Sequence, residues 1–301
     1  MKIAVTGASG MLGSSLIEYF SKKYKVFGTS RSKGIEGENI NWNCFDLTSI
    51  ILLENWLKKI KPDIVIHCAA IVDVDFCEEN IILAEKLHIE TTRVLSNYLD
   101  RNNARLIYIS TDSVFDGKKN SAYNEDDYES PLNIYSKTKL SGEKVALSIN
   151  NSLVLRTNIV GYTKYGSSFA EWVLSGLINN ETLNLFYDVY FSPLNIYDLT
   201  LIIEKIIQNP IYGLYHCSSR DSISKYDFGD KMSQIFQLSN SNLKKVTVDN
   251  VKLNASRPKN MSLDIQKISV ALDYDFPTAI DSIKLLKVQY DNQNKLNHNY
   301  F

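Results

Sequence analysis

A glycine-rich turn at the start of the chain constrains the fold more than any other feature of the sequence. The apolar residues 2–6 lead directly into glycines at positions 7, 10 and 13, and a helical pattern begins at Met11. Glycines in this G-x-x-G-x-x-G spacing permit a tight strand-to-helix turn and let the backbone approach a pyrophosphate closely. The helix N-terminus then offers free N–H groups and a partial positive charge to the phosphates. The pattern predicts that a dinucleotide is bound by Gly7, Ser9, Gly10, Met11, Leu12 and Gly13.

The first half of the chain continues as an alternation of short apolar runs and amphipathic stretches. Strands that alternate with helices favour parallel pairing, right-handed crossovers and helices on both faces of the sheet. The predicted fold class is therefore α/β, with a Rossmann-type doubly wound parallel sheet. Strands are expected over residues 2–6, 25–29, 41–45, 64–68, 105–110 and 152–157, and helices over 11–22, 49–60 and 79–102.

The pattern changes near residue 160, which indicates two lobes of different size. Later segments are more irregular and richer in aromatic residues. We expect a dinucleotide-binding lobe over 1–160, with 196–210 packing back onto it. A smaller C-terminal substrate-binding lobe is expected over 161–195 and 211–290, with the site in the cleft between the lobes. Residues 291–301 are rich in asparagine and are expected to fray.

The composition argues against several classes of protein. The 301 residues carry 33 Lys and Arg against 34 Asp and Glu, so the formal net charge of −1 gives no support to a nucleic acid or an acidic membrane as partner. Four scattered cysteines form no C-x-x-C pair, which favours a reducing cytoplasm over a disulfide framework. The N-terminus lacks the apolar region and cleavage site of a signal peptide. No apolar run approaches the roughly 18 residues of a membrane span.

Residues after the second expected strand favour NADPH over NADH. Sites that bind NADH place an acidic residue near the end of this strand for the ribose 2′-hydroxyl. Ser30 and Arg31 stand there instead, and no acidic residue precedes Glu36. A guanidinium with hydroxyl neighbours suits a 2′-phosphate, although NADH stays open as the cofactor. The remainder of the pocket is predicted to comprise Asp46, Leu47, Cys68, Ala69 and Ala70.

A Tyr-x-x-x-Lys pair occurs twice, and only one pair has neighbours suited to catalysis. Tyr19 and Lys23 follow the glycine turn, and we interpret that pair as structural. Tyr135 and Lys139 follow a strand whose carboxyl end presents Thr111, and ligands of open parallel sheets bind at such ends. Carbonyl reduction needs a proton donor for the oxygen and a group that holds it. We therefore predict Thr111, Tyr135 and Lys139 as catalytic residues, with Lys139 lowering the pKa of Tyr135 and binding the nicotinamide ribose.

At these motifs the sequence resembles the extended short-chain dehydrogenase/reductases, and within them the dTDP-4-dehydrorhamnose reductase group. The resemblance rests on the glycine turn, the S-T-D-S-V-F-D-G run over 110–117, the run over 131–143 and Arg257-Pro258. It implies NADPH-dependent reduction of a nucleotide-activated 4-keto-6-deoxy sugar, with Arg257 facing the nucleotide diphosphate and Asp112 near the sugar. Further substrate contacts are expected from Val114, Phe115, Asn158, Phe169, Trp172 and Tyr190. The oligomeric state stays open, with a homodimer as one alternative.

Departures from the family pattern leave the identity of the sugar open. Ser168 stands before Phe169, where reducing members usually have Asn, and His88 stands where many relatives have Asn. The run D-V-Y-F-S-P-L over 188–194 replaces the usual Asp-Gln followed by Gly-x-Pro-Thr.

Two alternative functions stay open beside the reductase. Ser113 replaces the Glu of a 4,6-dehydratase and the Cys of a 3,5-epimerase-reductase, so neither reaction is favoured. A sugar-nucleotide 4-epimerase would share the catalytic trio and recycle the hydride, and a non-catalytic NADP-binding regulatory subunit would only bind the cofactor. No metal site is predicted, because His216-Cys217 lacks a third ligand nearby and the acidic residues 125–127 resemble a solvated loop.

Overall fold

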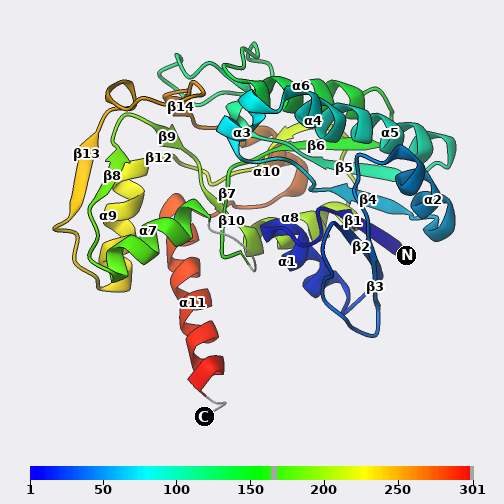
Figure 1. The fold of residues 1–301 in the computed structure, drawn as a ribbon, viewed down its shortest axis with the longest axis horizontal. Helices are drawn as coiled ribbons and strands as arrows, with labels where there is room; N and C mark the ends of the chain where they lie inside the picture. Colours follow the sequence, from blue (N-terminus) through cyan, green and yellow to red (C-terminus); the bar gives the residue numbers. More distant parts are fainter. Residues whose placement is uncertain (164–167, 299–301) are drawn as a thin grey trace.

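A seven-stranded parallel sheet forms the larger lobe of the computed structural model, which describes residues 1–163 and 168–298 (Figure 1). The strand order is β11-β6-β5-β4-β1-β2-β3, so the chain adds β2 and β3 on one side of β1 and all later strands of this sheet on the other side, beginning with β4. Ligands of such sheets bind at this switch point, between β1 and β4. The predicted fold class, an α/β Rossmann-type sheet with a smaller C-terminal lobe, is confirmed. The strands are β1 (Lys2–Thr6), β2 (Lys25–Ser30), β3 (Ile40–Cys44), β4 (Ile64–His67), β5 (Arg105–Ile109), β6 (Ser152–Arg156) and β11 (Gly213–His216).

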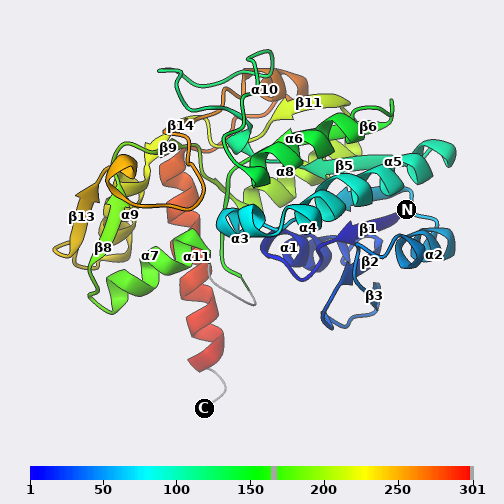
Figure 2. The ribbon, with the colours of Figure 1, turned by 45° about the horizontal axis from the view of Figure 1, so that its top comes forward.

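Helices cover both faces of this sheet, as Figures 1 and 2 show. In α1 (Met11–Phe20), Leu12, Leu16 and Phe20 recur at helical spacing and are buried against the sheet together with α8 (Ile196–Gln208) and α10 (Gln266–Leu272). The opposite face is covered by α2 (Ile50–Ile60), α5 (Thr91–Arg101) and α6 (Ile134–Ala146). The two apolar cores hold the carboxyl ends of the strands in fixed positions.

The helix expected over 79–102 is divided in the structure. It comprises α4 (Ile81–Glu85), the π-helix η1 (Lys86–Glu90) and α5, and the short helix α3 (Val74–Glu79) precedes it. Asn80 ends α3 with non-helical backbone angles, which accounts for the first break. Single π-turns inside helices are frequent at functional sites, and η1 carries His88.

Helix α8 lies against α1, and it is formed by the segment 196–210 that we expected to return to this lobe. Ser15 contacts Thr200 at 3.0 Å. The Tyr19 hydroxyl donates to Glu204, whose other oxygen lies 2.5 Å from Lys23 Nζ. Glu204 therefore gives the first Tyr-x-x-x-Lys pair a structural role.

The smaller lobe has its own apolar core and shorter strands. Helix α11 (Ala279–His298) leaves this core and extends away from both lobes (Figure 1). Residues 291–298 belong to α11 and residues 299–301 lie outside the described residues, so the expected fraying of 291–301 remains a prediction. The expected boundaries between the lobes also remain predictions. The other elements of this half are α7 (Phe169–Ile178), α9 (Lys225–Phe236), and the strand groups β7 (Ile159–Val160) with β10 (Leu194–Asn195), β8 (Leu183–Phe186) with β13 (Leu243–Val246), and β12 (Ile223–Ser224), β9 (Tyr190–Phe191) and β14 (Asn260–Met261).

None of the helices within 1–163 and 168–298 combines the length and the apolar character needed to cross a lipid bilayer.

Candidate active site

The glycine turn closes tightly between β1 and α1. Gly7 has a φ of +66°, and a Cβ at this position would lie 2.7 Å from the backbone of Ala69, just after β4. A Cβ at Gly13 would lie 2.2 Å from the Gly7 carbonyl oxygen, so the turn tolerates glycine alone at both positions. No side chain caps the N-terminus of α1 at Gly10. The N–H groups of the first turn, at Met11 and Leu12, therefore face a space suited to an anion.

Arg31 is the exposed cation at the end of β2. The neighbouring Ser30 hydroxyl donates to the Ser32 carbonyl at 2.6 Å. Lys33 is paired with Glu36 at 2.7 Å, whereas Arg31 forms no ion pair with any residue in the described ranges. Arg31 thus has a free guanidinium at the position predicted for a 2′-phosphate.

The other predicted cofactor residues lie at the ends of β3 and β4. Asp46 accepts hydrogen bonds from the Thr48 backbone and hydroxyl, both at 2.8 Å, and so stabilises its own turn. Leu47 and Ala69 are buried, and Cys68 is half-buried. The Gly7–Ala69 contact places the turn beside the 68–70 segment, whereas Asp46 lies beyond β3 at the sheet's edge.

The structure brings Thr111 and Tyr135 together. Thr111 follows β5, and Tyr135 lies in the first turn of α6, where Asn133 caps the helix by accepting from Ser136 N at 2.9 Å. Burial raises the pKa of Tyr135 to about 12, and a side-chain hydrogen bond with Thr111 offsets only part of this rise. The phenol therefore keeps its proton at neutral pH.

Lys139 lies one turn beyond Tyr135 and is almost fully buried. Its ammonium donates to the Ile109 carbonyl at 2.7 Å and lies 4.1 Å from the centre of the Tyr108 ring. Burial lowers the pKa of Lys139 to about 8, against the opposing charge of Glu143. We expected this ammonium to lower the pKa of Tyr135; the net pKa of the phenol is nevertheless raised, because burial is the largest influence on it.

A buried ion pair that the sequence analysis missed supports this end of the sheet. Glu143 accepts from Arg156, with Nη2 to Oε2 at 2.8 Å, and both side chains are 1% exposed. The Ser110 hydroxyl also donates to Glu143, and Arg156 Nη2 also donates to Glu129 Oε1 at 2.7 Å. The sequence did contain a signal for this pair, namely an arginine inside an otherwise apolar strand. A buried guanidinium needs a carboxylate partner to offset the loss of its hydration.

His88 holds the helix that carries Tyr135. Its Nε2 accepts from Ile71 N at 2.9 Å, so its Nδ1 is the protonated nitrogen, which lies 2.8 Å from Thr138 Oγ1. Its ring meets the Tyr135 ring edge-on, with centroids 5.9 Å apart. Burial lowers the pKa of His88 to about 2 and keeps the ring neutral. The histidine thus has a defined structural function next to Tyr135.

Asp112 and Asn158 lie together next to Thr111. Asn158 Nδ2 donates to Asp112 Oδ2 at 2.6 Å, and Thr111 Oγ1 donates to Oδ1 at 3.2 Å. Burial raises the pKa of Asp112. Phe169 and Trp172 lie farther out on α7, with ring centroids 6.1 Å apart, and Trp172 is 44% exposed.

Val114 and Phe115 lie in the core, which corrects their predicted role in substrate binding. Both are fully buried, and Phe115 stacks on Tyr123 with centroids 4.1 Å apart. The short 3-10 helix η2 (Asp112–Val114) is responsible, because it directs the following residues away from the cleft and into a small apolar cluster.

A cavity of about 810 Å³ contains Tyr190 and Arg257 in its wall, but neither Thr111 nor Tyr135. Tyr190 and Arg257 thus line a cavity whose wall does not include Thr111 or Tyr135. Arg257 Nη2 is paired with Asp75 of α3 at 3.1 Å, while its Nη1 is buried without a partner among the described residues. An arginine with one unsatisfied amino group in a cavity wall suits an anionic ligand.

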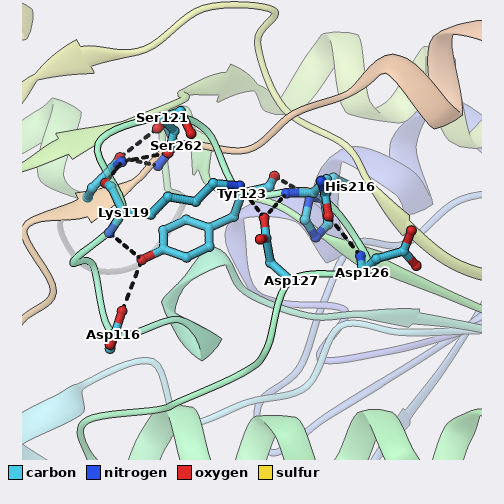
Figure 3. Close-up of polar contacts among 10 residues, drawn as sticks. Asp116, Lys119, Ser121, Tyr123, Asp126, Asp127, His216 and Ser262 are labelled. Atoms are coloured by element: carbon cyan, nitrogen blue, oxygen red, sulfur yellow. Dashed lines mark hydrogen bonds and ion pairs between the residues drawn. The ribbon is translucent and has the colours of Figure 1, made fainter.

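The acidic loop at the rim of this cavity is neutralised by its own contacts (Figure 3). The Tyr123 hydroxyl donates to Asp116 at 3.0 Å, and Lys119 Nζ lies 2.5 Å from Asp127. Glu125 accepts from the backbone of His216 at 2.8 Å. In the parts of the chain that the structure covers, no group of three His, Cys, Asp or Glu side chains is placed to hold a metal ion.

Lys225 is a further residue that the sequence analysis missed. Its ammonium lies 3.4 Å from the centre of the Phe191 ring and 4.3 Å from that of Phe169, and it interacts electrostatically with Asp112. The available signal was a lysine directly after Ser224, which caps α9, because a cation is unfavourable at a helix N-terminus.

Together, the parallel sheet, the glycine turn and the Thr-Tyr-Lys group define a dinucleotide-binding protein of the Rossmann class. The chain belongs to the family described as the RmlD substrate binding domain, whose sequence model matches residues 1–286. This confirms the resemblance stated above.

Known proteins similar to this chain include both a reductase and a subunit of an adenosyltransferase. It is 28% identical to dTDP-4-dehydrorhamnose reductase of Aggregatibacter actinomycetemcomitans, over 94% of this chain and 98% of that protein. It is 31% identical to methionine adenosyltransferase 2 subunit beta of Xenopus laevis, over 88% of this chain and 80% of that protein. The crystal structure of dTDP-4-dehydrorhamnose reductase from Bacillus anthracis in complex with NADP is similar, with a TM-score of 0.84, 27% identity, and coverage of 96% of this chain and 99% of that one.

Proposed function

We propose that the protein is an NADPH-dependent reductase of a nucleotide-activated 4-keto-6-deoxy sugar. The observation that carries the proposal is the contact between the Thr111 and Tyr135 hydroxyls, one helical turn before the buried Lys139. Membership of the family and the likeness to a dTDP-4-dehydrorhamnose reductase support the sugar-nucleotide class of substrate.

The larger lobe fits NADPH as the cofactor. The uncapped N-terminus of α1 and the turn at Gly7 suit the pyrophosphate, and Arg31 beside Ser30 suits the 2′-phosphate. A similar structure was determined with NADP bound. When bound, NADPH supplies the hydride that reduces the carbonyl carbon of the sugar.

The side chains of this protein then handle the proton and the oxygen. Thr111 donates a hydrogen bond to the carbonyl oxygen, and Tyr135 transfers its phenolic proton to it, so that the carbonyl becomes a hydroxyl group. The raised pKa of Tyr135 keeps that proton in place until charge develops on the oxygen. The ammonium of Lys139 stabilises the phenolate that is left, and water returns the proton.

The test is NADPH oxidation against a panel of 4-keto sugar nucleotides that differ in base and sugar. Tyr135→Phe should bind NADPH normally and lose turnover by roughly 100-fold or more, because it lacks the transferable proton. Tyr19→Phe is the matched control, since Tyr19 has the same i, i+4 lysine but contacts Glu204, and it should keep its turnover. Full turnover in Tyr135→Phe would contradict the assigned proton donor.

The likeness to methionine adenosyltransferase 2 subunit beta supports a second candidate, a non-catalytic subunit that binds NADPH without reducing a sugar. Binding of NADPH with no turnover of any panel member would favour it. Conversion of a panel sugar into its 4-epimer, with the cofactor retained and unconsumed, would favour a 4-epimerase.

A further inference from the structure

The position of Lys225 is not explained by the stability of its own helix. The residue begins α9, where the partial positive charge of the helix N-terminus disfavours a cation. Ser224 already caps this helix by accepting from Asp227 N at 3.0 Å. The Lys225 ammonium instead turns toward the faces of Phe191 and Phe169, which hold a cation without using its hydrogen-bond donors.

Those donors have no acceptor within residues 1–163 and 168–298. No described carboxylate lies within 4.0 Å of the Lys225 ammonium, and no described oxygen accepts a hydrogen bond from it, although the residue is half-buried and Asp112 attracts it. Burial lowers the pKa of Lys225 to about 8, and the charge of Asp112 opposes this change. The donors of this half-buried ammonium are therefore available to a ligand that supplies an acceptor.

Asp112 provides the complementary half of this arrangement. Its carboxylate is fixed by Asn158 at 2.6 Å and by the Ser113 hydroxyl at 3.2 Å. The Thr111 hydroxyl also donates to it at 3.2 Å, and it leaves this contact when it donates to the carbonyl oxygen. An ionised carboxylate has further lone pairs available for another donor. Because Asp112 directly follows Thr111, it lies next to the hydroxyl that is proposed to hold the carbonyl oxygen.

We propose that Lys225 and Asp112 together bind the sugar hydroxyl next to the reacting carbonyl. A hydroxyl group can accept from the ammonium and donate to the carboxylate at the same time. The inference rests on the proposed reductase function and deepens it.

The test compares Lys225→Met with Lys245→Met in steady-state NADPH oxidation. Lys245 is the matched control, because its ammonium also lies over an aromatic ring of this lobe, 4.6 Å from the centre of Tyr226. With the panel sugar that the wild type reduces best, Lys225→Met should raise KM about tenfold and change kcat by less than about threefold. Lys245→Met should match the wild type.

An analogue without the hydroxyl next to the carbonyl separates recognition from packing. The wild type and Lys225→Met should reduce this analogue with the same KM, and Lys225→Arg should recover most of the affinity for the full sugar.

An unchanged KM in Lys225→Met, or an equal rise with the analogue, would overturn the role of Lys225. If Lys225→Met does not fold, Lys225→Gln gives the same comparison. A wild type without turnover on any sugar nucleotide would refute the proposed function, whereas normal wild-type turnover with an unaffected Lys225→Met refutes only this inference.

Discussion

Burial sets the protonation state of the groups around Tyr135. It raises the pKa of the Tyr135 phenol to about 12 and lowers that of the Lys139 ammonium to about 8. At neutral pH the phenol is thus a proton donor and the lysine is mostly charged. Both states are those required for reducing a carbonyl, and the lysine is the group closer to losing its proton.

We predict that kcat falls as the pH rises through about 8, because the Lys139 ammonium then loses the charge that stabilises the phenolate. Glu143 and Cys68 are the charged or titratable groups that oppose this loss. The measurement is single-turnover NADPH oxidation at saturating sugar nucleotide, from about pH 6 to about pH 10.

Lys225 also has a pKa near 8, so the same profile is measured in Lys225→Met. The decline should persist there, since Lys139 is intact. A profile that stays flat through about pH 9.5 in the wild type, or that becomes flat in Lys225→Met, would remove Lys139 as its origin.

At the scale of elements, local patterns were predictable and contacts between distant elements were not. The glycine turn and the placement of Thr111 after β5 depend on residues adjacent in sequence. Strand β11 has only four residues and depends on pairing with β6, so its own sequence carried little signal. Lys225 and Asp112 lie 113 positions apart, and their proximity arises only when the lobes pack.

Helices α1 and α8 provide a prediction at this scale. Glu204 accepts from Tyr19 and pairs with Lys23, and its side chain is 11% exposed. Glu204→Ala should lower the free energy of unfolding by about 1–2 kcal/mol, because it leaves the partly buried Tyr19 hydroxyl without its acceptor. Urea denaturation measures the change.

Lys23→Met is the control for the charge pair alone. Its side chain is 51% exposed, so solvent screens the pair and the loss should be below about 1 kcal/mol. An equal loss in both variants would show that the hydrogen bond from Tyr19 contributes nothing to the packing of α8.

At the scale of the molecule, one loop of the smaller lobe is attached to the larger lobe next to the site. Asp75 of α3 accepts from Ala255 N at 2.9 Å and pairs with Arg257 at 3.1 Å. Asn133, which caps the helix carrying Tyr135, donates to the Ser256 carbonyl at 2.9 Å. The loop that presents Arg257 to the cavity is thus oriented by the same elements that position the proton donor.

Asp75→Ala should therefore raise the KM for the sugar nucleotide by about threefold to tenfold and leave the KM for NADPH unchanged. Two effects compete in this variant. Removing the carboxylate frees Arg257 for an anionic diphosphate, but this pair is partly exposed and contributes below about 1 kcal/mol. Losing both oriented contacts to the loop costs more, since each fixes a group that must meet the ligand.

Asp275→Ala is the control for this prediction. Asp275 pairs at 3.1 Å with Arg220, another arginine of the cavity wall, and its replacement should leave KM unchanged. A lower KM in Asp75→Ala would instead mean that Asp75 competes with the diphosphate for Arg257.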